Sequence, residues 1–235
     1  MKKIKKAFVL AAGLGTRMQP LTDSRPKPLI EVDGRTMIDR ALDRLVEFGV
    51  EEAIVNTHYK PEMIEEHLAK RKDIEISFSR EKERLETGGG LLHARDKLGN
   101  DPVFVVSTDI VWQDSGKTGL ETLAENWDDK LVGLLLLNQV ATGYGYDGRG
   151  DFKLYQDGRI EWRDADNNAP YVFTGLQIIC PKVFDRPAIH EMGPVFALNK
   201  LYTLYLENFR GVEYHGKWYH IGTPEALKLL PSLRA

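Results

Sequence analysis

An apolar run that leads directly into a glycine-rich, cationic loop is the feature that most constrains the fold of this chain. Residues 7–12 are expected to form a buried strand, and the chain then continues GLGTRMQPLTDSRPKP. Gly13 and Gly15 permit backbone angles and close approaches that a side chain would block. Backbone amides of the loop can therefore face phosphate oxygens.

The side chains of this loop also suit a polyphosphate. Thr16 supplies a hydroxyl, Arg17 a rigid fork for two phosphate oxygens, and Lys27 a movable charge between two prolines. A dinucleotide fingerprint would need a third glycine where Met18 stands, and a Walker loop would need GK followed by Ser or Thr, which is absent. An ordinary strand-to-loop turn is the alternative. We predict a nucleoside triphosphate site whose nucleotide-binding residues include Ala11, Ala12, Gly13, Gly15, Thr16 and Arg17.

Strand-like runs and helical patterns alternate through the first half of the chain. The strand-like runs are residues 6–12, 53–56, 74–78 and 103–107. This βαβ order predicts an α/β fold with a Rossmann-like, mostly parallel sheet covered by helices. Ligands of such sheets lie beyond the carboxyl ends of the strands. The loop after Ala12, the segment before Gly90 and the residues after Val106 are therefore expected to converge.

The second half of the chain is less regular. Short strands are expected at residues 152–155, 159–162 and 171–179, after a glycine-rich loop at 142–151. Such antiparallel strands would form a smaller lid that receives a second substrate. With 235 residues and 42% hydrophobic content the chain can bury a full core, and we expect a single domain over residues 1–235.

Composition and charge exclude several classes of partner. A formal charge of −3 and a pI near 6.1 are not those of a nucleic-acid-binding protein. No stretch reaches the roughly 18 apolar residues of a membrane span. The start MKKIKKAFVLAAG has the pattern of a signal peptide, but cleavage there would destroy the phosphate loop. The single cysteine, Cys180, excludes an intrachain disulfide, which fits a reducing compartment. We therefore predict a cytoplasmic protein, and from its charge and hydropathy we expect it to bind neither nucleic acid nor membrane.

The loop motif resembles that of the sugar-nucleotidyltransferase family, which reads GxGTR and, further along, PKP. The matching residues are Gly13, Gly15, Thr16, Arg17 and Pro26-Lys27-Pro28. The resemblance implies the nucleotide-diphospho-sugar transferase fold and a reaction between a nucleoside triphosphate and a sugar 1-phosphate that releases pyrophosphate. Longer members carry a hexapeptide-repeat β-helix after the catalytic domain. Since this sequence ends at Ala235, we expect no such domain, and a monomer or small homo-oligomer.

Asp109 follows an apolar strand in the sequence STD, where a carboxylate would point into the crevice beyond the sheet. Mg²⁺ is usually bound by one or two carboxylates together with substrate phosphates, so one well-placed Asp is sufficient as an anchor. A turn or helix cap is the alternative. The family has a GD or TD dipeptide whose Asp binds the metal, and Thr108-Asp109 matches it. The resemblance implies Mg²⁺ as cofactor and Arg17, Lys27 and Asp109 as catalytic residues.

The main departure from the family lies at His220. A second metal-binding Asp of the family belongs to a WxDxGT element, whereas residues 218–223 here read WYHIGT. Histidine is poorly suited to Mg²⁺ but acceptable to Mn²⁺, Co²⁺ or Zn²⁺. His220 can therefore bind a softer metal, hydrogen-bond a phosphate or a metal-bound water, mark lost activity, or simply pack beside Trp218.

Residues 85–90, LETGGG, open a predicted helix. Their glycines would let a flat nucleobase lie against the backbone, or serve only as turn residues. In the family this element contacts base and substrate, and the version here resembles that of N-acetylmuramate 1-phosphate uridylyltransferases, whereas guanylyltransferases more often have LGTAG. Glu81 matches a base-facing position and could accept protons from either uracil or guanine. Further nucleotide contacts are thus expected at Glu81, Thr87 and Gly88, with the base left open.

Contacts to the sugar rest on weaker matches. Residues 148–152, GRGDF, resemble the same uridylyltransferase subgroup, although alone they are merely a glycine loop. Thr174-Gly175 match a family position whose backbone meets the sugar. Residues 161–163, EWR, are the nearest sequence match to the family's Glu-Lys pair. No residue is assigned to the sugar phosphate. Sugar contacts are expected at Asp151, Thr174 and Gly175.

The resemblance implies UTP and N-acetylmuramate α-1-phosphate as substrates, in the recycling of peptidoglycan sugars. GTP with mannose 1-phosphate is the alternative pair. A catalytically silent regulatory subunit that binds nucleotide-sugars is an alternative of another class. His220 suggests that alternative, and the joint presence of Arg17, Lys27 and Asp109 argues against it.

Overall fold

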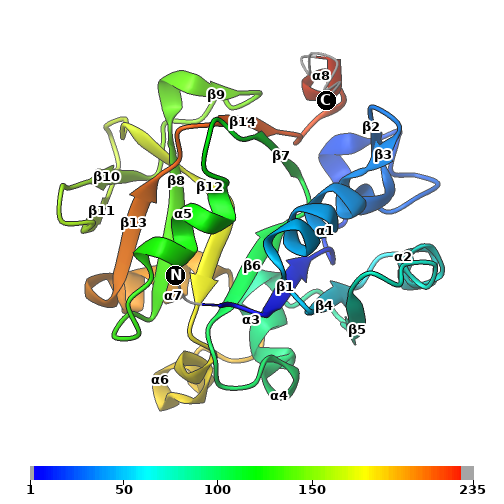
Figure 1. Cartoon of the computed structure of the whole chain (residues 1–235), viewed down its shortest axis with the longest axis horizontal. Helices are drawn as coiled ribbons and strands as arrows, with labels where there is room; N and C mark the ends of the chain where they lie inside the picture. Colours follow the sequence, from blue (N-terminus) through cyan, green and yellow to red (C-terminus); the bar gives the residue numbers. More distant parts are fainter. Residues whose placement is uncertain (1–2, 229–235) are drawn as a thin grey trace.

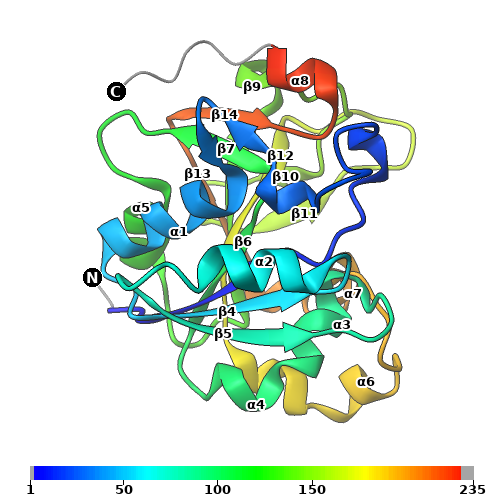
Figure 2. The ribbon, with the colours of Figure 1, turned by 90° about the vertical axis from the view of Figure 1, so that its right-hand side faces the viewer.

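The core of the molecule is one twisted sheet with helices on both of its faces (Figures 1 and 2). The structure is a computed structural model and describes residues 3–228. Four strands of the first half run parallel in the order β6-β1-β4-β5. Their bounds are β1 Lys6–Leu10, β4 Glu52–Thr57, β5 Glu75–Arg80 and β6 Val103–Ser107. The predicted βαβ order and the α/β fold class are confirmed.

Strands of the second half continue the same sheet in antiparallel fashion. β12 (Tyr171–Ile179) pairs with β6 on one side and with β8 (Gly133–Gln139) on the other, and the register shifts between Phe173 and Gln177. The remaining strands are β10 Phe152–Leu154, β11 Ile160–Trp162 and β13 Phe209–Glu213, which lies parallel to β8. The short antiparallel strands expected from the sequence are thus present, joined edge to edge with the parallel part.

Helices cover both faces of the sheet because the strand side chains alternate between two cores. Ala7 and Val9 face one core together with α1 (Met37–Phe48), α2 (Pro61–Leu68) and α5 (Gly119–Asn126). Phe8 faces the other core, which includes α3, α4, α6 and α7 (Figure 2). The bounds of these helices are α3 Glu86–His93, α4 Arg95–Leu98, α6 Pro187–His190 and α7 Leu198–Leu204.

A second, three-stranded sheet in the order β7-β14-β9 was not predicted. Its strands are β7 Ile110–Gln113, β9 Gly143–Tyr144 and β14 Lys217–His220. Because β7 begins one residue after Asp109 and β14 pairs with it, His220 lies opposite Ile110. The pairing of β14 with β7 therefore brings His220 close to the carboxyl end of β6.

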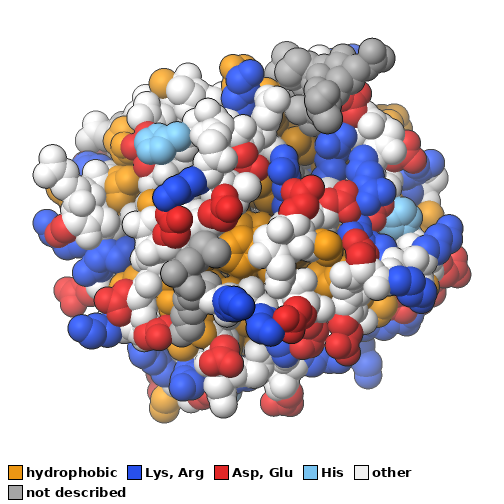
Figure 3. Space-filling view, in the orientation of Figure 1, with side chains coloured by type: hydrophobic (Ala, Val, Ile, Leu, Met, Phe, Trp, Pro, Cys, Tyr) orange, Lys and Arg blue, Asp and Glu red, His pale blue; other side chains and the backbone are white. Residues whose placement is uncertain are grey.

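Short elements complete the described residues. The last helix is α8 (Pro224–Lys228), and a two-residue hairpin pairs β2 (Glu31–Val32) with β3 (Arg35–Thr36). The 3₁₀ turns are η1 Thr16–Met18, η2 Lys27–Leu29, η3 Val140–Thr142, η4 Pro181–Asp185 and η5 Leu206–Asn208. Positive and negative side chains are interspersed over the face shown in Figure 3. Within residues 3–228 no helix has the length and apolar character needed to cross a membrane.

Candidate active site

A pocket of about 230 Å³ lies beyond the carboxyl ends of β1, β4 and β6, where the sequence placed the ligand. The loop after β1, the segment before α3 and the residues after β6 all contribute to it. Six of the predicted site residues line the pocket, namely Ala12, Gly13, Lys27, Glu81, Thr87 and Asp109. The expected convergence of three segments is therefore found.

The two glycines of the phosphate loop differ in what a side chain at their position would meet. Gly15 has a left-handed φ of +67°, and a Cβ there would lie 2.9 Å from side-chain carbons of both Lys27 and Thr22. The Thr22 hydroxyl also donates to the Gly15 carbonyl at 2.9 Å. Gly13 lines the pocket, and a Cβ on it would meet no atom within 4 Å. Gly15 is required by the loop itself, whereas Gly13 leaves room for a ligand.

We predict that alanine substitutions separate these two roles. Gly15→Ala should lower the free energy of unfolding by about 2 kcal/mol or more, because it forces a side chain into a left-handed backbone and two close contacts. Gly13→Ala should leave the unfolding midpoint nearly unchanged yet weaken nucleotide binding at least about 10-fold, since the new methyl group occupies ligand space. Thermal unfolding and calorimetric titration with UTP measure the two effects. Equal destabilisation by both variants would contradict this division.

Lys27 and Asp109 form an ion pair inside the pocket. The Lys27 ammonium donates to Asp109 Oδ2 at 2.9 Å, and its side chain is only 11% exposed, against 31% for Asp109. Thr108, the residue between strand and carboxylate, donates its hydroxyl to the Leu10 carbonyl at 3.0 Å and so ties β6 to β1. Burial raises the pKa of the Asp109 carboxyl, but the charges of Lys27 and His220 outweigh it, and the pKa lies below its usual value. Asp109 is thus an anion at neutral pH with a cation already beside it.

His220 reaches the same carboxylate from β14. Its Nε2 lies 3.9 Å from Asp109 Oδ2, while its ring stacks on Trp218 with centroids 6.0 Å apart. Burial is the main influence on the imidazole and lowers its pKa, and the Asp109 charge opposes this. Among residues 3–228 no group of three or more His, Cys, Asp or Glu side chains is arranged to hold a metal. A metal at Asp109 and His220 would need ligands from the substrate as well.

Arg17 stands at the rim rather than in the pocket. It belongs to η1, which is anchored by the fully buried Met18, and its own side chain is exposed. It forms no hydrogen bond or ion pair with any other residue that the structure describes, yet its charge is close enough to His220 to lower the imidazole pKa. Its neighbour Thr16 is also exposed. Arg17 is therefore a free cation on the side of the site where Asp109 and His220 meet.

The first glycines of α3 pack closely against the segment before α7. The N–H groups of Gly88 and Gly89 both donate to the Phe196 carbonyl at 2.9 Å. A Cβ on Gly88 would lie 2.3 Å from the Phe196 ring, and one on Gly89 would lie 2.1 Å from the Pro194 carbonyl oxygen. The adjacent Thr87 lines the pocket and accepts a hydrogen bond from the Leu198 N–H. Phe196 therefore fills the space that a side chain at position 88 would need, and a contact of Gly88 with nucleotide stays a prediction.

Two of the residues expected to contact sugar are held in structural roles. Thr174 is buried, its hydroxyl donates to the Leu136 carbonyl at 2.8 Å, and its own carbonyl accepts from Trp218 Nε1 at 2.9 Å. The hydroxyl and the carbonyl of Thr174 are thus both engaged within the protein, and a contact of its backbone with a sugar stays a prediction. The Asp151 carboxylate accepts from the Phe173 N–H at 2.9 Å, and burial raises its pKa.

Gly175, the third residue assigned to sugar, packs against a residue of the pocket wall. It has a φ of +84°, and a Cβ on it would lie 3.1 Å from the Ser107 side chain. Ser107 lines the pocket. The β-bulge of β12 at Gly175 therefore borders the pocket, which Thr174 and Asp151 do not line.

Sequence reasoning missed several pocket residues. Asn56 is the next-to-last residue of β4, and a polar residue near the carboxyl end of a buried strand is a signal that could have revealed it. Arg84 and Glu86 also line the pocket and pair with each other at 2.8 Å. Glu86 has a φ of +63°, a backbone conformation that no sequence pattern announces for a glutamate.

Fold and pocket together define an α/β protein with a pocket at the carboxyl ends of its parallel strands, and comparison with known proteins gives the family. The family described as nucleotidyl transferase matches residues 6–161, more than half of the chain. The N-acetylmuramate alpha-1-phosphate uridylyltransferase of Caulobacter vibrioides is 41% identical over 232 residues, covering 94% of this chain and 93% of that protein. This chain therefore belongs to the nucleotidyl transferase family, as its loop motif indicated.

Two other similarities are more distant. The mannose-1-phosphate guanyltransferase of Hypocrea jecorina is 31% identical over 236 residues, covering 94% of this chain and 61% of that protein. The structure of the inositol-1-phosphate CTP transferase from T. maritima superimposes with a TM-score of 0.79 at 17% identity, covering 97% of this chain and 92% of that one. The structural likeness supports the fold assignment.

Proposed function

We propose that this protein transfers a uridylyl group from UTP to a sugar 1-phosphate, with N-acetylmuramate α-1-phosphate as the preferred acceptor. The observation that carries the proposal is the pocket at the strand ends, where the glycine loop, Lys27 and Asp109 meet. The choice of UTP and of the muramate sugar rests on the 41% identity to a uridylyltransferase of that name. Reuse of peptidoglycan sugars in the cytoplasm is the setting that this chemistry suggests.

The reaction is an in-line displacement at the α-phosphorus. An oxygen of the sugar phosphate forms the new bond, the bond to the β-phosphate oxygen breaks, and pyrophosphate leaves with its electron pair. The nucleophile is a phosphate monoester with a second pKa of about 6, so it is already anionic near neutrality and needs no general base. Catalysis then consists of positioning and charge neutralisation.

Different residues of the chain bind the triphosphate and neutralise its charge. The backbone of residues 13–16 holds the triphosphate, and Arg17 stabilises the charge that develops on the departing pyrophosphate. Lys27, already in the pocket, meets the phosphates near the reacting centre. Its short contact with Asp109 keeps the ammonium in place before the substrate arrives.

The residues at the end of β6 fit a divalent cation bound jointly with phosphate oxygens. Asp109 supplies the carboxylate that Mg²⁺ prefers, and one or two carboxylates suffice when substrate phosphates complete the shell. A bound cation would supply charge neutralisation to the phosphates. We place His220 beside this cation, as a nitrogen ligand or as a hydrogen-bond partner of a phosphate or water, because its Nε2 converges on Asp109.

Metal removal and exchange test this assignment. Chelation should abolish turnover and Mg²⁺ should restore it, because the phosphate charges would otherwise remain unscreened. His220→Asp should raise activity with Mg²⁺ relative to Mn²⁺ at least several-fold, since an oxygen ligand favours the harder ion. Pyrophosphate release in each metal measures the ratio. Full activity in the presence of chelator would refute the metal, and an unchanged ratio in His220→Asp would place His220 outside its coordination.

The experiment that tests the function is pyrophosphate release by the purified protein with five nucleoside triphosphates and several sugar 1-phosphates. Release confined to UTP with N-acetylmuramate α-1-phosphate is the expected result. Release with GTP and mannose 1-phosphate would move the substrates to the alternative pair, which the 31% identical guanyltransferase supports. Nucleotide binding without release under any condition would identify a silent regulatory subunit instead.

A further inference from the structure

The second half of the phosphate loop, residues 19–25, is held by the short connection between β4 and α2. The Tyr59 hydroxyl donates to the Thr22 carbonyl at 3.1 Å and to the Asp23 carbonyl at 3.3 Å. The Lys60 ammonium donates to the same Asp23 carbonyl at 2.8 Å. Within residues 3–228, no other residue outside the phosphate loop forms a hydrogen bond or ion pair with residues 19–25. Tyr59 and Lys60 thus form a clasp on the loop.

The residues that the clasp binds fold back on the turn that carries Arg17. The Thr22 hydroxyl and the Met18 N–H both donate to the Gly15 carbonyl, at 2.9 and 2.8 Å. Both lone pairs of that carbonyl oxygen are therefore used. Thr22 is only 3% exposed, so its two hydrogen bonds are shielded from water. Holding the Thr22 backbone therefore holds η1, the turn to which Arg17 belongs.

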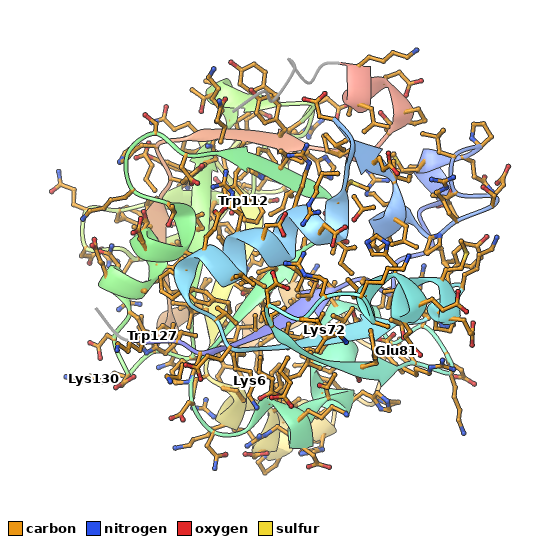
Figure 4. The ribbon with its side chains drawn as sticks, turned by 45° about the vertical axis from the view of Figure 1, so that its right-hand side comes forward. Lys6, Lys72, Glu81, Trp112, Trp127 and Lys130 are labelled. Carbon is orange, nitrogen blue, oxygen red and sulfur yellow. The ribbon has the colours of Figure 1, made fainter. Side chains whose placement is uncertain are left out.

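The clasp itself is fixed to the main sheet. His58 Nδ1 donates to the Glu81 carbonyl at 2.9 Å, and Glu81 directly follows β5 (Figure 4). Lys60 precedes α2 with a φ of +49°, a left-handed backbone that is uncommon for a residue with a side chain. Its ammonium lies 5.2 Å from the centre of the Tyr59 ring. The strain at Lys60 is retained together with its contact to Asp23, although a glycine would adopt this backbone freely.

We propose that Tyr59 and Lys60 are positioning residues, which hold the phosphate loop so that Arg17 meets the departing pyrophosphate. Arg17 has no hydrogen bond or ion pair within residues 3–228, so the backbone of η1 alone sets its place before a substrate binds. A loop without its clasp would have to be ordered on the way to the transition state, which raises the barrier to reaction. This inference rests on the proposed function, since it assigns two further residues to that reaction.

Two single variants test the clasp by removing one donor each. Tyr59→Phe keeps the ring and should lower kcat for pyrophosphate release at least about 5-fold, while the KM for UTP stays within about two-fold. Lys60→Gly should lower kcat by a similar factor. Because glycine adopts the left-handed backbone without strain, the unfolding midpoint of Lys60→Gly should stay within about two degrees of the native value. Loss of turnover without loss of stability is not the result of a merely structural role.

A double-mutant cycle shows whether the clasp acts through Arg17. In the Arg17→Ala background, Tyr59→Phe should lower kcat by less than about two-fold further, because the group that it positions is already absent. Tyr214→Phe is the matched control, since the Tyr214 hydroxyl also joins two segments, donating to Asp114 at 2.9 Å, and neither residue lines the pocket. Its kcat should stay within about two-fold of the native value. An equal loss of kcat from Tyr59→Phe in both backgrounds, or none in the native one, would overturn the proposal.

Amide hydrogen exchange keeps this inference distinct from the proposed function, because it needs no substrate. The N–H groups of Leu21 and Asp23 donate to carbonyls within the loop, at Met18 and Pro20. They should exchange at least about 10-fold faster in Tyr59→Phe than in the native protein or in Tyr214→Phe. Faster exchange in a protein that releases no pyrophosphate would refute the transferase reaction and leave the clasp standing. Unchanged exchange together with release by the native protein would refute the clasp alone.

Discussion

Asp109→Asn is expected to lower kcat for pyrophosphate release by about 10³-fold or more. The amide keeps the shape of the side chain but removes the charge that anchors the cation and that holds the Lys27 ammonium at 2.9 Å. Binding of UTP without metal should change far less, because the glycine loop and the base subsite are untouched. Steady-state release assays and calorimetric titration with UTP in chelator measure the two quantities.

A second variant separates the loss of turnover from the loss of folding stability. Asp109→Asn leaves Lys27 as a nearly buried cation without its carboxylate, so the free energy of unfolding should fall by about 1–3 kcal/mol, less than for a fully buried pair because Asp109 is 31% exposed. Asp109→Asn combined with Lys27→Gln removes both charges and should regain most of that stability while staying inactive. A single variant that retains a tenth of native turnover would show that Asp109 is not the anchor.

The fold and the centre of the site were predictable because both follow from local patterns. Alternating strands and helices fix where strand ends lie, so Gly13, Lys27 and Asp109 could be expected in one crevice. His220 was expected near the metal only by resemblance. Its actual position depends on the pairing of β14 with β7, a contact between segments more than a hundred residues apart that no periodicity encodes.

The packing around two of the predicted contact residues was not predictable from the sequence. Gly88 and Thr174 belong to motif strings, and a string does not say which side of the backbone faces the ligand. In the structure, Phe196 fills the space beside Gly88, and the Leu136 carbonyl and Trp218 satisfy the polar groups of Thr174. Asn56 was missed because it is held in the pocket wall by two hydrogen bonds to residues far along the chain.

Arg17→Ala is expected to lower kcat by about 10²–10³-fold with little change in stability. The side chain is exposed and has no hydrogen bond or ion pair within residues 3–228, so its removal breaks no native polar interaction. Its loss removes a cation from the pyrophosphate that leaves, and such stabilisation acts mainly in the transition state. Arg17→Lys should recover only part of the rate, since an ammonium cannot hold two phosphate oxygens in the fixed geometry of a guanidinium.

Arg25→Ala is the matched control, because Arg25 is an exposed arginine of the same loop that, unlike Arg17, is not among the charges with the largest influence on the pKa of His220. Its kcat should stay within about two-fold of the native value, which would exclude a general effect of lost positive charge on nucleotide attraction. The effect of Arg17→Ala should fall on kcat more than on the KM for UTP. A large rise in KM at constant kcat would instead assign Arg17 to ground-state binding of the triphosphate and remove it from the catalytic residues.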